Sequence, residues 1–240
     1  MKAPRQALLA AWLVCSGLPP AGAGHTVLIW PVDPAITGDQ HAAELWVENR
    51  GQSTTLLQAR IFAWQQVSGR EQYQTQRDIV ATPAMVRLDA GQKQLIRLIR
   101  QTSPAGGEEH AYRVLLDEIP TPPDPPDDPK HSLSFQMRYS IPLFVYGPGN
   151  GADTGAPALS WRPVKIGTDT FLEITNRGPV HARLSNISLG KQQLTDGLYG
   201  YVLAHSSHRW PLAVNPMPGA VLQATVDNRN TRWQSAASAP

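Results

Sequence analysis

Short runs of alternating apolar and polar residues are the feature of this sequence that most constrains its fold. Nothing after residue 23 repeats the helical period over three turns. The clearest alternating runs occupy residues 43–47, 57–63, 95–100 and 112–116. In an extended strand, such alternation sends successive side chains to opposite faces. Turn residues separate the runs at spacings typical of an antiparallel sandwich. The sequence therefore predicts an all-β fold.

The length of the chain and one Gly/Pro-rich stretch predict two domains. The 240 residues fit two sandwiches of roughly 100 residues each. Residues 146–157 (YGPGNGADTGAP) are the best candidate for a linker. Weaker strand signals follow at residues 171–175, 182–189, 198–204 and 220–226. We predict two immunoglobulin-like β-sandwich domains with a cleft between them, at residues 24–147 and, in a smaller second domain, residues 148–240.

The first 23 residues have the pattern of a signal peptide. Lys2 and Arg5 give a basic start, and residues 7–18 form an apolar run too short to span a bilayer. Small residues follow at Ala21 and Ala23, so we place the cleavage after Ala23. A buried N-terminal helix is the less favoured alternative. No other segment is long and apolar enough to cross a membrane, so we expect export without membrane insertion.

Charge and cysteine content exclude several classes of function. The signal segment carries two basic and no acidic residues, so 21 − 2 = 19 basic residues face 19 acidic ones in the mature chain. A chain without excess positive charge gives no support for nucleic-acid binding. Cys15 is the only cysteine and lies in the signal segment. The mature protein is therefore expected to lack disulfides, a thiol nucleophile and thiolate metal sites.

The sequence also lacks the motifs of an enzyme or a metalloprotein. His205 and His208 are the only closely spaced histidines of the mature chain, and their spacing lacks a carboxylate or cysteine partner. There is no Gly-rich phosphate loop, no nucleophile elbow and no pair of catalytic carboxylates. We therefore expect a protein that is not an enzyme and that holds no cofactor or metal.

The most informative segment is residues 133–141. Five apolar residues alternate without a break with four polar ones; the apolar ones are Leu133, Phe135, Met137, Tyr139 and Ile141. In an extended strand one face is then continuously apolar. Two interpretations stay open from periodicity alone. The segment is either a central strand that covers the core of its own domain or an edge strand that offers its side chains to a partner.

Several segments together resemble the PapD-like periplasmic pilus chaperones. These segments are residues 27–36 (the first predicted strand), 43–50, 83–100 and 109–120, followed by the alternating segment 133–141 and residues 141–145. The resemblance covers nearly the whole first domain and is weak in the second. Stretches such as VLIWPVDP and MRYSIPLF are similar to the divergent branch that serves non-classical fimbriae.

The resemblance implies a mechanism in the periplasm. Pilus subunits of these systems are incomplete sandwiches, and the chaperone lends them a strand before an outer-membrane usher assembles the fimbria. Carried onto this sequence, the donor residues are Leu133, Phe135 and Met137. Tyr139 and Ile141 extend the same row. The expected partners are thus pilus (fimbrial) subunits and an usher.

The sequence departs from relatives where they bind the subunit's terminal carboxylate. Relatives use a basic residue on the first strand and a lysine late in the donor strand. Here residues 27–36 contain no basic residue, and the late position is Pro142. Burying a carboxylate needs charged donors. Arg138 is our first candidate for this anchor, since it shares the strand and, by parity, the face of the missing lysine.

Arg97 and Arg100 are the next candidates for the anchor, because a neighbouring strand could bring one of them close. The resemblance also assigns a structural role to Glu109. It matches an acidic residue that joins an ion pair near the domain cleft in relatives.

One alternative function from a different class stays open. Two sandwiches with exposed aromatic residues also suit a fimbrial adhesin or a carbohydrate-binding module. Complex formation with a pilin-like subunit favours the chaperone, and glycan binding by the isolated protein favours the module.

Overall fold

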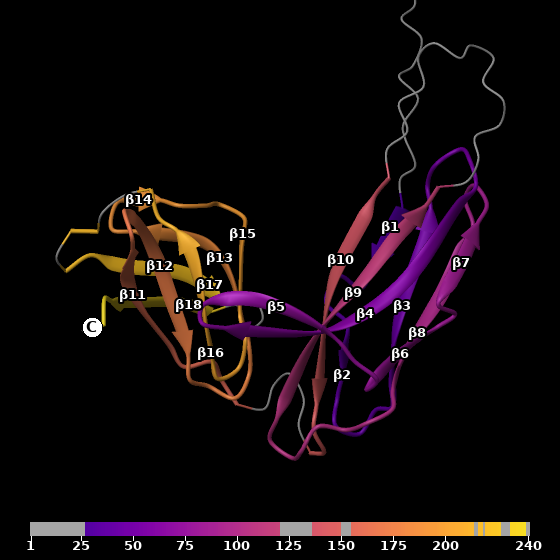
Figure 1. Ribbon diagram of the computed structural model, residues 1–240, viewed down its shortest axis with the longest axis horizontal. Helices are drawn as coiled ribbons and strands as arrows, with labels where there is room; N and C mark the ends of the chain where they lie inside the picture. Colours follow the sequence, from indigo (N-terminus) through magenta and orange to yellow (C-terminus); the bar gives the residue numbers. More distant parts are fainter. Residues whose placement is uncertain are drawn as a thin grey trace, which may run out of the picture.

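The computed structural model describes residues 27–120, 136–149, 155–213, 216–217, 219–226 and 231–238. These residues form eighteen strands arranged in four sheets, and none of them is helical (Figure 1). In these ranges there is accordingly no helix long and apolar enough to cross a membrane. The prediction of an all-β fold with two sandwich domains is confirmed. The predicted signal peptide lies outside the described residues.

Two sheets form the first domain. The first sheet has the order β1-β3-β8-β6, with strands Val27–Trp30, Ala42–Asn49, Lys93–Arg100 and Ile79–Thr82. The second has the order β2-β10-β9-β4-β5, with strands Ala35–Ile36, Arg138–Tyr146, Glu109–Ile119, Thr55–Val67 and Arg70–Thr75. Strand β7 (Met85–Leu88) pairs with β4 in the second sheet. The two sheets face each other across one hydrophobic core.

The alternation of the sequence explains this core. Leu45 on β3, Ile96 on β8 and Leu116 on β9 are fully buried and pack in one cluster. Their polar neighbours in the sequence point to the opposite face of each sheet. Burial of each large apolar side chain contributes roughly 1.5–3 kcal/mol. The first domain therefore owes its stability mainly to a core that the sequence pattern predicts.

The chain between residues 27 and 36 differs from the single strand that we expected. Strand β1 pairs with β3 in the first sheet, whereas β2 lies parallel to β10 in the second. Pro31 and Pro34 separate the two strands, and proline has no N–H group for a sheet ladder. The chain therefore leaves one sheet after Trp30 and joins the other, where Ala35 and Ile36 pair with the end of β10.

Two further sheets form the second domain. One has the order β11-β12-β16, with strands Leu159–Ile166, Asp169–Asn176 and Ser206–Pro211. The other has the order β14-β13-β17-β18 with β15 paired to β13, and its strands are Gln192–Gln193, Ala182–Leu189, Val221–Val226, Thr231–Ala236 and Leu198–Val202. Trp161, Leu172 and Leu184 are among the buried residues of its core.

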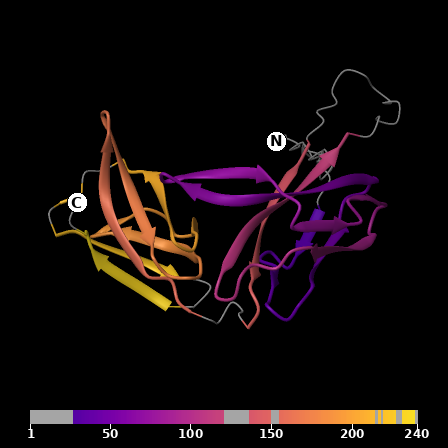
Figure 2. The same ribbon diagram turned by 60° about the horizontal axis from the view of Figure 1, so that its bottom comes forward.

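A long hairpin of the first domain reaches the second. Strands β4 and β5 extend beyond their own sandwich and lie against the second domain (Figure 2). At the hairpin tip, the carbonyl oxygen of Gly69 accepts a hydrogen bond of 3.0 Å from the backbone N–H of Arg209 on β16. The side chain of Arg209 is paired with the buried Glu173, which also binds Arg162 at 2.7 Å. The tip thus rests on a fixed part of the second domain.

A separate cluster joins the two domains nearer the linker. It is made by side chains from both domains: Trp64, Phe144, Tyr146, Val180, Tyr201 and Leu203. Two hydrogen bonds also link Gln66 on β4 to the backbone of Tyr201 and Leu203. A cavity of about 440 Å³ remains between the domains, lined on one side by Trp64 and Tyr112 and on the other by Leu203 and Ser206. The two domains are therefore held at two places around a cleft.

We expect Gly69→Ala to weaken the contact at the hairpin tip. Gly69 has a φ of +77°, and a Cβ atom there would lie 2.6 Å from Cγ of Arg209. Gly91→Ala is a matched control, because Gly91 has a φ of +74° and a Cβ atom there would have no neighbour within 4 Å. Left-handed backbone costs about 1–2 kcal/mol for alanine in both variants.

Urea unfolding with protease digestion between the domains measures the difference. Gly69→Ala should lose more stability than Gly91→Ala and should be cut faster between the domains. Equal behaviour of the two variants would mean that the tip contact does not hold the domains together.

Candidate functional site

Among the described residues, strand β10 is paired along one side only for most of its length. It is antiparallel to β9 from Arg138, opposite Asp117, to Tyr146, opposite Glu109. On its other side, β2 meets it only at Phe144 and Val145. In the part of the chain that the structure describes, residues 138–143 have no strand on this outer side. Their edge is thus a template on which another chain can add a strand.

The apolar row of the predicted donor strand leaves the core along this edge. Ile141 is 6% exposed and belongs to the core of the first domain. Tyr139 packs partly buried against that core, with its hydroxyl 3.4 Å from the backbone nitrogen of Val27. Met137, just before β10, is 45% exposed. Leu133 and Phe135 lie outside the described residues. The row therefore passes from core to solvent between Ile141 and Met137.

The opposite face of β10 meets the second domain at its C-terminal end. Phe144 is buried, and its ring stacks on the imidazole of His181 with centroids 3.4 Å apart. Tyr146 is buried in the same cluster. This cover explains why the alternation in the sequence stops after Ile141: both faces of the strand are buried from that point on.

Arg138 lies on the outer face of β10 in a small charged cluster. Its Nε donates to Asp117, and Arg60 on β4 binds the same carboxylate at 2.7 and 2.8 Å. Burial opposes the charged form of Asp117, but the hydrogen bonds from Arg138 and Arg60 outweigh it and lower the pKa of this carboxyl. Two guanidinium groups on one carboxylate leave one net positive charge. The Arg138 side chain is 63% exposed, so it keeps N–H groups for a partner.

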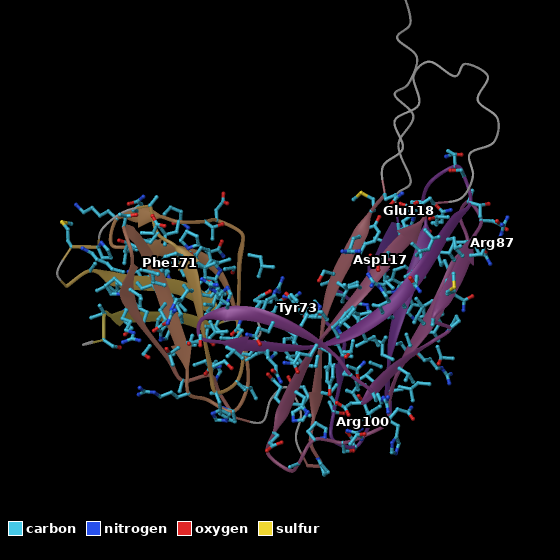
Figure 3. All side chains as sticks on the ribbon, viewed as in Figure 1. Tyr73, Arg87, Arg100, Asp117, Glu118 and Phe171 are labelled. Carbon is cyan, nitrogen blue, oxygen red and sulfur yellow. The ribbon has the colours of Figure 1, made fainter. Side chains whose placement is uncertain are left out.

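The other two arginines that the sequence suggested lie elsewhere. Arg97 is exposed on β8, in the first sheet. Arg100 is buried, and its guanidinium donates to the carbonyl oxygens of Tyr146 at 3.2 Å and Gly38 at 3.4 Å. Figure 3 places Arg100 at the opposite end of the first domain from Asp117. The described contacts bring neither of them to Arg138.

Sequence reasoning missed Arg113, which the fold places next to Pro142. These two residues are partners in the β9–β10 register. The guanidinium of Arg113 lies 3.8 Å from the ring centroid of Trp64 and 5.3 Å from that of Tyr201. Its buried Nε has no hydrogen-bond partner among the described residues, and no ion pair of this arginine is found there. Parity in the sequence predicts the face of Arg113, but only the register shows its neighbour.

Tyr73 adds a polar group to the same region. Its hydroxyl donates to Glu71 and also interacts with Arg113. Partial burial and the neighbouring Glu71 raise the pKa of Tyr73 to about 12. The hydroxyl therefore keeps its proton near neutral pH. Figure 3 shows this tyrosine between the two domains.

Glu109 joins the two domains, as the resemblance to relatives predicted. Its carboxylate accepts hydrogen bonds of 2.9 Å from the backbone N–H and 2.8 Å from Nδ1 of His181. The Glu109 and His181 side chains are almost fully buried. The structure therefore places Glu109 at the contact between the domains, with His181 as its hydrogen-bond partner.

Comparison with known proteins agrees with this architecture. Residues 34–150 match the family model described as pili and flagellar-assembly chaperone, PapD N-terminal domain. The chaperone CsuC, in its complex with the tip adhesion subunit CsuE of the archaic Csu pili of Acinetobacter baumannii, shares 29% identity at a TM-score of 0.74. That match covers 88% of this chain and 98% of CsuC. The first domain, which the family model matches, therefore belongs to the PapD-like family of pilus chaperones.

More distant chaperones share the fold. The SafB chaperone of Salmonella enterica, solved with the SafA pilin, matches at 16% identity and a TM-score of 0.62, covering 88% of this chain and 96% of SafB. The periplasmic chaperone SfaE matches at 16% identity and a TM-score of 0.57, covering 89% and 100%. No curated protein sequence matches this chaperone. The matched family is a family of assembly chaperones and not of enzymes, and SfaE is described as a periplasmic chaperone.

We expect Glu109→Leu to destabilise this chaperone more than Glu108→Leu. Glu109 is buried against His181, and a buried group left without its hydrogen bonds costs about 1–3 kcal/mol. Glu108 is exposed and lies 3.4 Å from the exposed His110. Such a surface pair contributes at most about 1 kcal/mol. Urea unfolding of both variants measures the difference, and equal midpoints would show that the buried pair does not hold the domains together.

Proposed function

We propose that this chaperone binds an incomplete pilus subunit at the open edge of β10 and keeps it folded until an outer-membrane usher receives it. The observation that carries the proposal is the one-sided pairing of residues 138–143 beside the exposed Met137. The membership of its first domain in the pilus chaperone family supports the same function.

The subunit groove receives the part of the apolar row that the chaperone's own core does not use. Ile141 belongs to that core, and Tyr139 is shared between core and edge. Met137 projects beyond it, and Leu133 and Phe135 continue the same parity in the sequence. Each large side chain moved from water into a groove contributes roughly 1.5–3 kcal/mol.

Backbone pairing supplies the second part of the binding. A strand of the subunit that adds to residues 138–143 satisfies the N–H and C=O groups of the open edge. Pro142 suits such an edge, since a proline cannot donate to a ladder. Because β9 already pairs with the other side of β10, the free chaperone keeps its fold without a subunit.

The subunit's terminal carboxylate is held by Arg138 or Arg113. Arg138 is exposed at the start of β10, in a cluster with one net positive charge. Arg113 lies opposite Pro142, the position at which relatives carry a lysine, and has no carboxylate of its own among the described ion pairs. Both lie on the outer face of the second sheet, which leads to the cleft. A carboxylate that binds on this face exchanges its hydrogen bonds to water for hydrogen bonds from charged donors.

We expect serine at Leu133, Phe135 and Met137 together to abolish subunit capture without unfolding the chaperone. The reason is that these side chains are needed by the partner and not by the core. Met85→Ser is the matched control, because Met85 is 52% exposed on β7, away from β10. Co-expression with a candidate pilin subunit, followed by purification of the complex, measures capture, and circular dichroism measures folding.

Two outcomes of this experiment would contradict the donor strand. If the triple variant unfolds, these residues belong to the core, since each large-to-small core change costs about 2–5 kcal/mol. If it folds and still captures the subunit, the binding row lies elsewhere. Glycan binding by the isolated wild-type protein, without any subunit complex, would instead support the carbohydrate-binding alternative.

We expect alanine at the anchoring arginine to weaken capture strongly and leave the free fold intact. Loss of one partner of a buried charge pair costs about 2–5 kcal/mol, which is a loss of affinity of at least about 30-fold. Arg138→Ala and Arg113→Ala are compared with Arg87→Ala, an arginine that is 70% exposed on β7. Titration with purified subunit gives the affinities. If both test variants bind like Arg87→Ala, the anchor is neither arginine.

A further inference from the structure

Glu118 on β9 holds the chain at the point where the donor row leaves the sheet. One carboxylate oxygen accepts a hydrogen bond of 3.3 Å from the backbone N–H of Met137, and the other accepts one of 2.9 Å from the hydroxyl of Thr55. The backbone N–H of Glu118 donates to the carbonyl oxygen of Met137 at 3.0 Å. Glu118 is 9% exposed. A buried carboxylate thus ties the first residue before β10 to both β9 and β4.

The neighbouring residue of β9 holds the next residue of β10 on the other face. Asp117 binds Arg138 and Arg60, whereas Glu118 points inward to Met137 and Thr55. Figure 3 shows Asp117 and Glu118 together at the end of the first domain where β10 begins. Two consecutive carboxylates therefore fix two consecutive residues of the donor segment from opposite sides of one sheet.

In the proposed complex, the pilus subunit contacts every second side chain of the donor segment. A slip of a strand by one residue moves its whole apolar set to the other face. Among the described residues Met137 is the first of the apolar row; its backbone is tied to the sheet, and its side chain is 45% exposed. The position of its backbone decides which face of the preceding residues meets the groove of the subunit.

We infer that Glu118 is a positioning residue that sets the register of the donor row on the subunit. The inference rests on the proposed function, because it concerns the same strand. It assigns to Glu118 a role separate from donor side chains and from the carboxylate anchor, since Glu118 contacts the chaperone's own backbone. The role needs an acceptor for the N–H of Met137 and does not need a negative charge.

Two substitutions separate the acceptor from the charge. Glu118→Leu has similar bulk and removes both acceptors. Glu118→Gln can turn its oxygen to the N–H of Met137 and donate its amide to the hydroxyl of Thr55, which accepts as well as donates. Glu48→Leu is the control for loss of a buried carboxylate, because Glu48 is 5% exposed in the other sheet and pairs with Arg50 and Lys93.

The full-length mature chaperone is tested with the purified pilin candidate. Glu118→Leu should bind the subunit about tenfold or more weakly, because the hydrogen bond that holds the backbone of Met137 is lost. Hydrogen exchange at the amide of Met137 should become faster in this variant. Glu118→Gln and Glu48→Leu should bind within about threefold of the wild type. Single cysteines placed along residues 133–137 should cross-link to shifted positions on the subunit only in Glu118→Leu.

Three results would overturn the inference. One is wild-type affinity in Glu118→Leu despite faster exchange at Met137, and another is an unchanged cross-linking pattern. The third is equal weakening by Glu118→Gln and Glu118→Leu, which would point to the charge. If Glu118→Leu does not fold, Thr55→Val tests the same support from its other side and should speed exchange at Met137. Failure of the wild-type chaperone to bind any subunit would instead contradict the proposed function.

Discussion

The one-sided pairing of β10 is the constraint on which the rest of this chaperone depends. A strand with both sides paired would give a closed and inert sheet, and a strand with neither side paired would not be ordered. Here β9 pairs along the whole strand, and β2 covers the other side only at Phe144 and Val145. The free chaperone is therefore stable and still exposes a strand edge, which isolated proteins usually hide.

The second domain stabilises this arrangement, because it covers the face of the same sheet that points away from the core of the first domain. Trp64, Phe144 and Tyr201 pack together where the domains meet, and Glu109 binds His181 beside them. The hairpin of β4 and β5 adds a second contact at Gly69. With two contacts the cleft has a fixed shape. Arg113 then lies over Trp64, beside the contact between the domains.

The two sandwiches could be predicted because a strand with one buried face shows in the sequence as an alternation of apolar and polar residues. Leu45, Ile96 and Leu116 each follow it, and all three are in the core. Strand β5 could not be found in this way, because all its residues are exposed and its role is to reach the second domain. The split of residues 27–36 between two sheets follows from Pro31 and Pro34, but prolines also fit an edge strand, so their presence alone does not predict the change of sheet.

The candidate site was only partly accessible to sequence reasoning for a similar reason. Tyr139 and Ile141 could be assigned to one face by parity, and the fold agrees. The partner of Pro142 depends on the register between β9 and β10, which no local pattern contains, so Arg113 was missed. Likewise Arg100 satisfies backbone carbonyls at the far end of the domain, and nothing in its sequence neighbours indicates this. The register between strands that are distant in the sequence is therefore not visible in a local sequence pattern.

The carboxylates at the end of β9 show how electrostatics supports the open edge. Because Arg138 and Arg60 lower the pKa of Asp117, its contribution to stability is present above the unfolded pKa, about 4. It is lost only as the pH falls through the lower folded value. The start of β10 is thus held by the carboxylate of Asp117, which stays charged under neutral and mildly acidic conditions. Hydrophobic side chains bind the partner, whereas these polar contacts keep the strand that presents them in place.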